Sequence, residues 1–393
     1  MEEPRSKDSV SLLAYLASTH FIIHVYTQLL PVLLLPLMDE LGVSLVQVSL
    51  LASIPRFINV VAYIPIGAAA DRRPALILMV SFIVTALGSL LIPVSRSLYP
   101  ILAGFAMLSL GSTLYHPPSL KLASEFDSKK VSLAMGIHNA GANLGFAVGP
   151  LLLGLLMPVW GWRVSFLIWG PITLLMAAVS NIYTRRRFGS GATAQLEKTG
   201  FRQGFRSLLT AGYITVAAMS VLAEAVFNIL FTFTPTYFTM ERGMSYSLAS
   251  IVAGLGPLTG LAGSFVGGLS GDRLGKYRTG LVILLLMTVL LVVFPYSPSL
   301  LSLAVAYALY RCLQAAFMPL MNAMIASHSD AESRSLAFSV NFVLVSLVGS
   351  FVPTATSVLI EAHGTPVIFP ISIITMVPTI GLILLLRRMS GAK

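Results

Sequence analysis

Long apolar segments separated by short polar interruptions make up most of the chain. A helix that spans a lipid bilayer needs about 20 mostly apolar residues, and twelve segments meet that requirement. Most of the interruptions carry charged residues, glycine or proline. The pattern predicts twelve membrane-spanning helices, near residues 10–38, 44–70, 75–95, 98–124, 131–158, 163–184, 208–237, 245–270, 279–296, 299–327, 334–361 and 365–386.

One interruption differs from the others, because residues 185–206 are polar and basic. This stretch separates the first six predicted spans from the last six. We therefore predict an N-terminal six-helix bundle at 1–184, a cytoplasmic basic linker at 185–206 and a C-terminal six-helix bundle at 207–393.

The two halves repeat the same marker residues. Asp71-Arg72 at the end of span two recurs as Asp272-Arg273 at the end of span eight, 201 residues later. Nearly the same offset relates Gly42 to Gly243, Pro117 to Pro319 and Pro150 to Pro353. Internal duplication with a binding site between the halves is typical of secondary transporters.

The composition supports a membrane protein. Hydrophobic residues form 56% of the 393 residues and charged residues only 10%, whereas soluble domains carry about 25% charged residues. A soluble chain with so few charges would lack the polar surface that it needs in water. The net charge of +10 does not indicate nucleic-acid binding, because the basic residues lie in short loops and no aromatic and basic patch accompanies them.

The distribution of basic residues predicts the orientation. Twelve spans place both termini on one side, and that side holds 20 of the Lys and Arg residues, against three on the other. Positive residues accumulate in cytoplasmic loops. We therefore expect a multi-pass protein of the cell membrane with both termini in the cytoplasm.

Three charged residues stand out in the middle of predicted spans: Arg56 in span two, Glu224 in span seven and Arg311 in span ten. Charges at membrane depth are costly and usually face a cavity or a partner. Two interpretations remain open, a functional site or a buried structural ion pair.

Polar residues also form stripes at helical spacing. Span one carries His20, His24 and Gln28, and span seven carries Ser220, Glu224, Asn228 and Thr232. Residues four apart share one face of a helix, so each set is expected to form a continuous polar face. Span ten adds Arg311 and Gln314, and span four adds His116.

These residues suggest a binding chemistry. Arginine is permanently charged and binds carboxylate or phosphate in a fork, so Arg56 and Arg311 against the single Glu224 favour an anionic solute. Glu224 is the only acidic residue predicted at mid-membrane depth and is the candidate proton carrier. His20 and His24 could share that role, since histidine exchanges protons near neutral pH.

The loop after span eight carries the most specific motif. Gly268, Asp272, Arg273, Gly275 and Lys276 match the pattern G-x-x-x-D-R-x-G-K/R, and through it the chain resembles the major facilitator superfamily. The first-half copy, from Gly67 to Arg73, is degenerate, because Pro74 stands near the place of the second glycine. A resemblance to the fosmidomycin-resistance type of exporter rests on Tyr115-His116-Pro117, Gly145-x-x-x-Gly149-Pro150 and Gly161-Trp162-Arg163.

The resemblance implies a central cavity lined by spans one and four and by their repeats. The expected substrate-binding residues are Arg56, Arg311, His24, Gln28, Asn228, Gln314 and His116. It also implies a conformational latch at the cytoplasmic face, formed by Gly67, Asp71, Arg72, Gly268, Asp272, Arg273, Arg334 and Lys130. Carboxylates are stabilised at helix N-termini, so Asp71 is expected near Arg334 and Asp272 near Lys130. The alternative is a simple charge cluster that sets topology.

The small residues of span five have two interpretations. In the family, Gly145, Gly149 and Pro150 resemble a motif of proton-coupled antiporters. Small residues at this spacing also allow ordinary close packing of membrane helices. The sequence leaves both open.

The resulting hypothesis is a monomeric, proton-coupled transporter that moves a small anionic solute by alternating access, with efflux by antiport as the favoured direction. Proton-coupled uptake of an organic anion is the main alternative, and a membrane-embedded enzyme is a remote one. No G-x-x-x-x-G-K-[ST] or H-E-x-x-H motif is present. His116 and His138 look too isolated in the sequence to be metal ligands, so we expect no metal and no cofactor, and as partners only the solute, protons and lipid.

Overall fold

The computed structural model describes residues 6–124, 131–188, 205–330 and 334–391. Within these ranges it contains twelve helical segments that are long and apolar enough to cross a membrane. The prediction of a twelve-span, all-α membrane protein is confirmed. By their contacts the helices sort into two units, Met1–Gln195 with Tyr246–Gly254, and Leu196–Ser245 with Leu255–Lys393.

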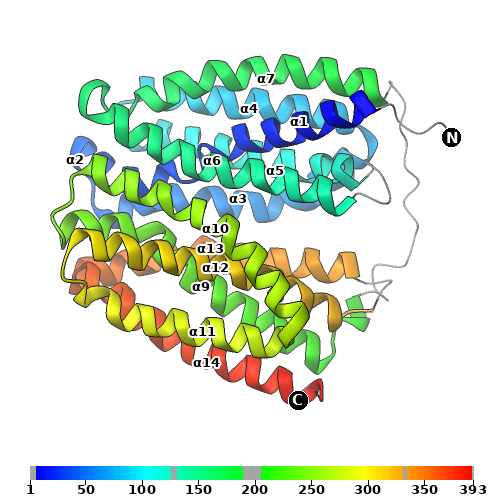
Figure 1. The fold of residues 1–393 in the computed structure, drawn as a ribbon. Helices are drawn as coiled ribbons and strands as arrows, with labels where there is room; N and C mark the ends of the chain where they lie inside the picture. Colours follow the sequence, from blue (N-terminus) through cyan, green and yellow to red (C-terminus); the bar gives the residue numbers. More distant parts are fainter. Residues whose placement is uncertain (1–5, 125–130, 189–204, 331–333, 392–393) are drawn as a thin grey trace. The chain divides into compact units, whose positions relative to one another are not determined.

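The first unit is built from seven helices. In it α4 packs against α5 and α7, α3 against α5, and α1 against α6 (Figure 1). Its helices are α1 (Ser6–His24), α2 (Leu29–Leu41), α3 (Leu45–Arg72), α4 (Pro74–Val94), α5 (Leu98–Ser124), α6 (Val131–Trp160) and α7 (Val164–Phe188).

The second unit repeats part of this scheme. Here α11 packs against α12 and α14, and α9 packs against α13 and α14 (Figure 1). Its helices are α9 (Ala211–Met240), α10 (Tyr246–Leu274), α11 (Lys276–Val293), α12 (Leu300–Ser327), α13 (Arg334–His363) and α14 (Ile368–Met389), with short 3-10 turns η1 (Phe294–Tyr296) and η2 (Thr365–Val367). The start of α10, Tyr246–Gly254, belongs to the first unit.

Repeated glycines have repeated backbone conformations. Gly42 ends α2 with φ of 61°, and Gly243 follows α9 with φ of 65°. A left-handed residue at a helix C-terminus is usually glycine, because it lacks a Cβ atom. After Gly42, the Ser44 hydroxyl accepts from the N–H of Gln47 and starts α3 with a capping box.

The first span is interrupted, which corrects one expectation. Helix α1 ends at His24, residues 25–28 form a turn, and α2 starts at Leu29. Gln28 therefore does not continue the helical face of His20 and His24. The physical reason is Pro31, which lacks an N–H and whose ring would clash with the carbonyl of the residue four positions earlier, Thr27.

Helix α1 lies on a face of α6 that has no side chains. A Cβ atom built on Gly141, Gly145 or Gly149 would lie 2.2, 2.5 or 2.0 Å from the backbone oxygen of Ala17, Phe21 or Val25, respectively. Glycine at these three positions permits backbone contact of α6 with α1 and with the start of the turn that follows α1. Gly145 and Gly149 are thus close-packing positions, and the antiporter interpretation stays a prediction.

Arg163 and Glu40 form an ionic contact at one end of the first unit. The Arg163 guanidinium donates to both oxygens of Glu40, at 2.6 and 2.5 Å. It also donates to the carbonyl oxygens of Pro93 and Ser95, at 3.0 and 3.2 Å. The Trp162 indole N–H donates to Glu40 at 2.8 Å. One side chain thereby joins the end of α2 to the turn after α4.

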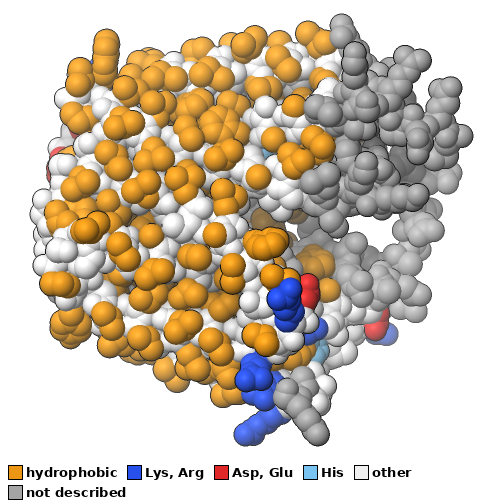
Figure 2. All heavy atoms as spheres, in the orientation of Figure 1, with side chains coloured by type: hydrophobic (Ala, Val, Ile, Leu, Met, Phe, Trp, Pro, Cys, Tyr) orange, Lys and Arg blue, Asp and Glu red, His pale blue; other side chains and the backbone are white. Residues whose placement is uncertain are grey.

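The outer surface matches a lipid environment. Apolar side chains cover most of the face shown in Figure 2, and the Lys and Arg side chains in view gather toward one end of it. Exposed examples include Val61 and Phe265, at 68% and 73% relative exposure. An apolar exterior is what a hydrocarbon solvent requires.

Candidate functional site

The histidines of the first unit form one cluster. His20 and His24 approach through their Nε2 atoms at 3.0 Å. The ring of His116, on α5, lies 5.5 Å from that of His20 and 5.3 Å from that of His24, measured between centroids. The ring of His138, on α6, stacks on His20 at 3.8 Å. The expectation that His116 and His138 are isolated is therefore wrong.

The sequence could not show this clustering, because the four histidines lie on three helices and their contacts depend on how these helices pack. His20 and His24 are buried, at 5% and 8% exposure, and His116 is half-buried. Their nitrogen atoms could hold a metal ion, since one from each of the three lies within 4.8 Å of the others.

The second unit holds the charged cluster. The Arg311 guanidinium donates to Gln314 Oε1 at 2.9 Å and its Cζ atom lies 5.6 Å from the Phe231 ring centroid. On α9, the Asn228 side-chain amide donates to Glu224 Oε1 at 2.9 Å. Tyr310 lies within electrostatic range of both Arg311 and Glu224. The structure thus pairs Arg311 with Gln314 and Glu224 with Asn228, and it adds Tyr310, which the sequence did not indicate.

The remaining members of the predicted cavity lie in the first unit. Arg56 is half-buried on α3. Gln28 is buried at 2% exposure in the turn before α2, and its Nε2 atom has no hydrogen-bond partner among the described residues. Arg56 and Gln28 share a unit with the histidine cluster, whereas Arg311 and Glu224 belong to the other.

The latch residues are described in part. Gly67, Asp71, Arg72 and Arg334 lie in helices, but their surroundings are outside the described set, and Lys130 lies outside the described residues altogether. Gly268, Asp272 and Arg273 lie in the last turns of α10, with Asp272 and Arg273 exposed. The latch therefore remains a prediction.

The second glycine of the motif has a clear structural role. Gly275 joins α10 to α11 with φ of 88°, a conformation that L-residues with a side chain rarely adopt. Its N–H donates to the Gly271 carbonyl. In the first unit Pro74 takes this place as the first residue of α4, which suits proline because the first turn of a helix needs no donor there. The first-half copy of the motif therefore joins α3 to α4 with a proline in place of the second glycine.

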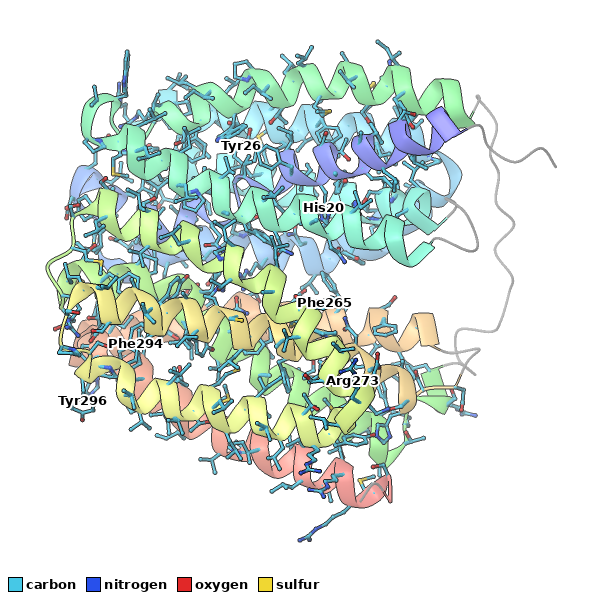
Figure 3. All side chains as sticks on the ribbon, viewed as in Figure 1. His20, Tyr26, Phe265, Arg273, Phe294 and Tyr296 are labelled. Carbon is cyan, nitrogen blue, oxygen red and sulfur yellow. The ribbon has the colours of Figure 1, made fainter. Side chains whose placement is uncertain are left out.

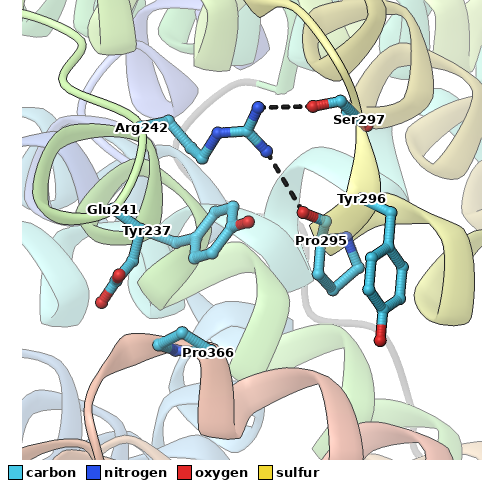
Figure 4. A pocket seen from close by; sticks show the side chains of 7 residues that line it. All are labelled: Tyr237, Glu241, Arg242, Pro295, Tyr296, Ser297 and Pro366. Atoms are coloured by element: carbon cyan, nitrogen blue, oxygen red, sulfur yellow. Dashed lines mark hydrogen bonds between the residues drawn. The ribbon is translucent and has the colours of Figure 1, made fainter.

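A pocket of about 340 Å³ lies at the opposite end of the second unit, beside the end of α9 (Figure 4). Arg242 crosses it and donates to the carbonyls of Pro295 and Ser297, at 3.3 and 2.5 Å. None of the predicted site residues lines it. The lining residues are Tyr237, Glu241, Arg242, Pro295, Tyr296, Ser297 and Pro366.

Comparison with known proteins agrees with this architecture. The chain is 22% identical over 279 residues to the fosmidomycin resistance protein of Escherichia coli (strain K12), covering 69% of this chain and 68% of that protein. It is 26% identical over 238 residues to the citrate–proton symporter of Klebsiella pneumoniae, covering 57% and 51%.

A solved bacterial homologue of the human lysosomal transporter Spinster, in an inward-facing occupied conformation, superposes with a TM-score of 0.79. It has 18% identity and covers 99% of this chain and 98% of its own, so this likeness concerns the fold. The family model of the Major Facilitator Superfamily matches residues 16–312 and 258–393. The chain therefore belongs to the Major Facilitator Superfamily of membrane transporters.

Proposed function

We propose that this transporter moves a small anionic solute by proton-coupled alternating access, with efflux as the favoured direction. The observation that carries the proposal is the setting of Arg311. Its permanently charged guanidinium lies half-buried within the candidate span Leu300–Ser327, and its hydrogen-bond partner among the described residues is the neutral amide of Gln314. A charge at such depth is costly, and a bound carboxylate or phosphate would neutralise it in a bidentate contact.

Proton coupling is assigned to Glu224. This carboxyl group lies within the candidate span Ala211–Met240, one helix turn from Asn228, whose amide donates to it. A carboxyl at this position can exchange a proton when water reaches it and retain the proton when water is excluded. Glu224 and Arg311 belong to the same unit, which supports coupling between proton and anion in the same half.

The direction rests on the relatives. The fosmidomycin resistance protein and the multidrug resistance protein MdtG of Yersinia enterocolitica are named for drug resistance, which favours efflux. The citrate–proton symporter favours the second candidate, uptake of an organic anion together with protons. The cationic site at Arg311 suits both, so the direction must be measured.

The remaining features of the proposal follow from sequence. We place the protein in the cell membrane as a monomer with both termini in the cytoplasm, and we retain the bundles 1–184 and 207–393, joined by the linker 185–206. Asp71 and Asp272 latch the cytoplasmic ends in this proposal. His24, His116, Gln28, Asn228 and Gln314 supply neutral contacts to the solute.

A ligand-stabilisation screen tests the anion site. Purified protein in detergent is heated with a panel of small organic anions, phosphorylated metabolites and neutral drugs, and the unfolding midpoint is recorded. We expect anions to raise the midpoint of the parent and of an Arg388→Ala control, which removes an exposed arginine at the end of α14. Arg311→Ala should lose the effect and Arg56→Ala should weaken it. If both variants respond like the parent, the anion site is elsewhere.

A further inference from the structure

Four of the six histidines of the chain lie together in the first unit, on helices α1, α5 and α6. Figure 3 labels His20, on α1. One nitrogen atom from each of His20, His24 and His116 lies within 4.8 Å of the other two. From this geometry we propose that His20, His24 and His116 form a binding site for one borderline divalent metal ion, represented by Zn²⁺.

The hydrogen bonds of His20 leave its Nε2 atom ready for a ligand. Its Nδ1 atom lies 2.8 Å from the backbone oxygen of His138. A carbonyl oxygen can only accept, so the proton of neutral His20 lies on Nδ1 and the lone pair lies on Nε2. Metal-binding histidines usually show this second contact, which fixes the ring orientation and makes the ligand nitrogen more basic.

His24 has a matching arrangement. Its Nδ1 atom lies 3.1 Å from the Thr27 hydroxyl oxygen, which can donate or accept. Without a metal, His24 Nε2 donates to the lone pair of His20 Nε2 at 3.0 Å, and Thr27 then donates to Nδ1. With a metal bound, the His24 proton moves to Nδ1 and is donated to Thr27, so that both Nε2 lone pairs point to the ion. The exchange needs only a tautomer change, and no charge is gained or lost on the ring.

The surrounding side chains hold the rings in place. The Tyr115 and His138 rings lie 5.5 and 3.8 Å from the His20 ring, and the Phe146 ring lies 4.4 Å from that of His24. Gly145 passes so close that an added Cβ would lie 3.1 Å from His24 Cβ. A metal site gains affinity when its ligands are fixed by packing before the ion arrives.

The ligand set selects the class of ion. Three neutral imidazoles suit Zn²⁺, Co²⁺, Ni²⁺ and Cu²⁺, whereas Mg²⁺ and Ca²⁺ require oxygen ligands. Among the described residues the cluster contains histidines alone. Three histidines with an open fourth position form a known type of zinc coordination.

The distances require one small adjustment. Zinc–nitrogen bonds of about 2.0–2.1 Å place tetrahedral ligand atoms about 3.3 Å apart. The Nε2 atoms of His20 and His24, at 3.0 Å, are already near that separation. The third nitrogen, from His116, lies within 4.8 Å, so it must approach by up to about 1.5 Å for a Zn–N bond to form. His116 is the least buried of the three, so its side of the cluster admits the ion.

The second half of the chain lacks the site. The repeat offsets of 200 for the stripe and 202 for Pro117 place Ser220, Glu224 and Met318 where the first half has His20, His24 and His116. The proposed ion is therefore specific to the first unit. The site shares His24 and His116 with the proposed solute contacts, whereas Arg311 belongs to the other unit, and metal binding can be measured without any transport.

The test is titration of Zn²⁺ into the full-length protein, purified in detergent, stripped with EDTA and desalted. We expect one ion per chain, and X-ray absorption of the loaded protein should show three imidazole nitrogens at about 2.0–2.1 Å. His20→Gln, His24→Gln and His116→Gln should each weaken binding by more than about 100-fold, because loss of an outer contact alone costs about 10- to 100-fold. Thr27→Val should fall within that smaller range. The His363→Gln control, at an exposed histidine outside the cluster, should bind like the parent.

Three results would overturn the site. One is an absorption spectrum with fewer than three nitrogen neighbours from imidazole, which needs no variant and so does not depend on whether a variant folds. Another is loss of the stoichiometric ion in His363→Gln together with its retention in His20→Gln, which would indicate chance binding at a surface histidine. Absence of Zn²⁺ binding to the parent would also refute the proposal.

Discussion

Arg163 and Arg242 bind equivalent backbone carbonyls in the two halves of the chain, although they lie at the ends of different helices. Arg163 follows α6 and donates to the carbonyls of Pro93 and Ser95. Arg242 follows α9 and donates to those of Pro295 and Ser297, which lie 202 residues further along the chain. The acceptors of the duplicated fold have been kept, while the donor has changed its position.

Replacing Arg163 should destabilise the first unit. Arg163→Gln removes a two-pronged contact to Glu40 and two bonds to carbonyls, and charge-assisted bonds of this kind contribute about 1.5–3 kcal/mol. Arg96→Gln is the matched control, since Arg96 lies 4.0 Å from the same carboxylate but is 75% exposed, and exposed pairs contribute about 0–1 kcal/mol. Thermal unfolding in detergent should show a clearly lower midpoint for Arg163→Gln alone. Equal midpoints for both variants would contradict the role given to Arg163.

A second prediction concerns the glycine residues of α6 that contact α1. Gly145→Ala puts a methyl group 2.5 Å from the Phe21 oxygen, and overpacking of this kind costs about 1–3 kcal/mol. Gly136→Ala on the same helix meets nothing within 4 Å and should be neutral or slightly stabilising, because alanine favours helix. Expression level and unfolding midpoint measure both variants. A tolerated Gly145→Ala would mean that α1 and α6 can separate at little cost.

Glu224→Gln should separate proton coupling from solute movement. Glutamine keeps the size of the side chain and its contact with Asn228 but cannot carry a proton. In liposomes we expect transport driven by a pH gradient to collapse, while exchange of labelled for unlabelled solute continues. Gradient-driven transport at the parent rate would move the coupling role to another residue.

The stability of the second unit should depend on pH through His328. Its Nε2 atom lies 2.9 Å from the Tyr277 hydroxyl, and burial, with the nearby Lys276 ammonium as a smaller cause, lowers the pKa of His328. Protonation is therefore harder in the folded protein than in the unfolded chain. The stabilisation from neutral His328 is fully present above about pH 6.5 and is lost as the pH falls through the lower pKa of the folded state.

The measurement compares the parent with His328→Gln from about pH 8 to about pH 5. The unfolding midpoint of the parent should exceed that of the variant most at the alkaline end, and the difference should shrink on acidification. His363→Gln serves as a control for general effects of removing a histidine. A difference that stays constant over the range would show that His328 does not titrate differently in the folded state.

The fold was predictable because lipid imposes a simple requirement on sequence. Each span must be long and apolar, so helix number could be counted, and the duplicated Asp-Arg and glycine markers revealed the two halves. Boundaries near glycine were also accessible, because Gly42 and Gly243 adopt a conformation that few other residues can. The break after His24 was missed, although Pro31 was its signal in the sequence, because the apolar pattern continues through it.

The candidate site was predictable only in part. Charged residues at membrane depth are so costly that Arg311 and Glu224 stand out along the chain, and the i, i+4 spacing paired Glu224 with Asn228. The contact of His20 with His116 and His138 could not be derived, because helical spacing gives no information about which helices pack together. Tyr310 was missed for the same reason, since tyrosine is common in membrane helices.

The turn between α1 and α2 also affects how the chain fits its bilayer. The stretch Ser11–Leu41 contains 31 residues, and a straight helix of that length would extend about 46 Å, whereas the hydrocarbon layer is about 30 Å thick. The two shorter helices, α1 and α2, can tilt by different amounts. The excess length can then fit within the bilayer without thickening it. The proline that interrupts the helix thus lets an overlong segment match membranes of different thickness.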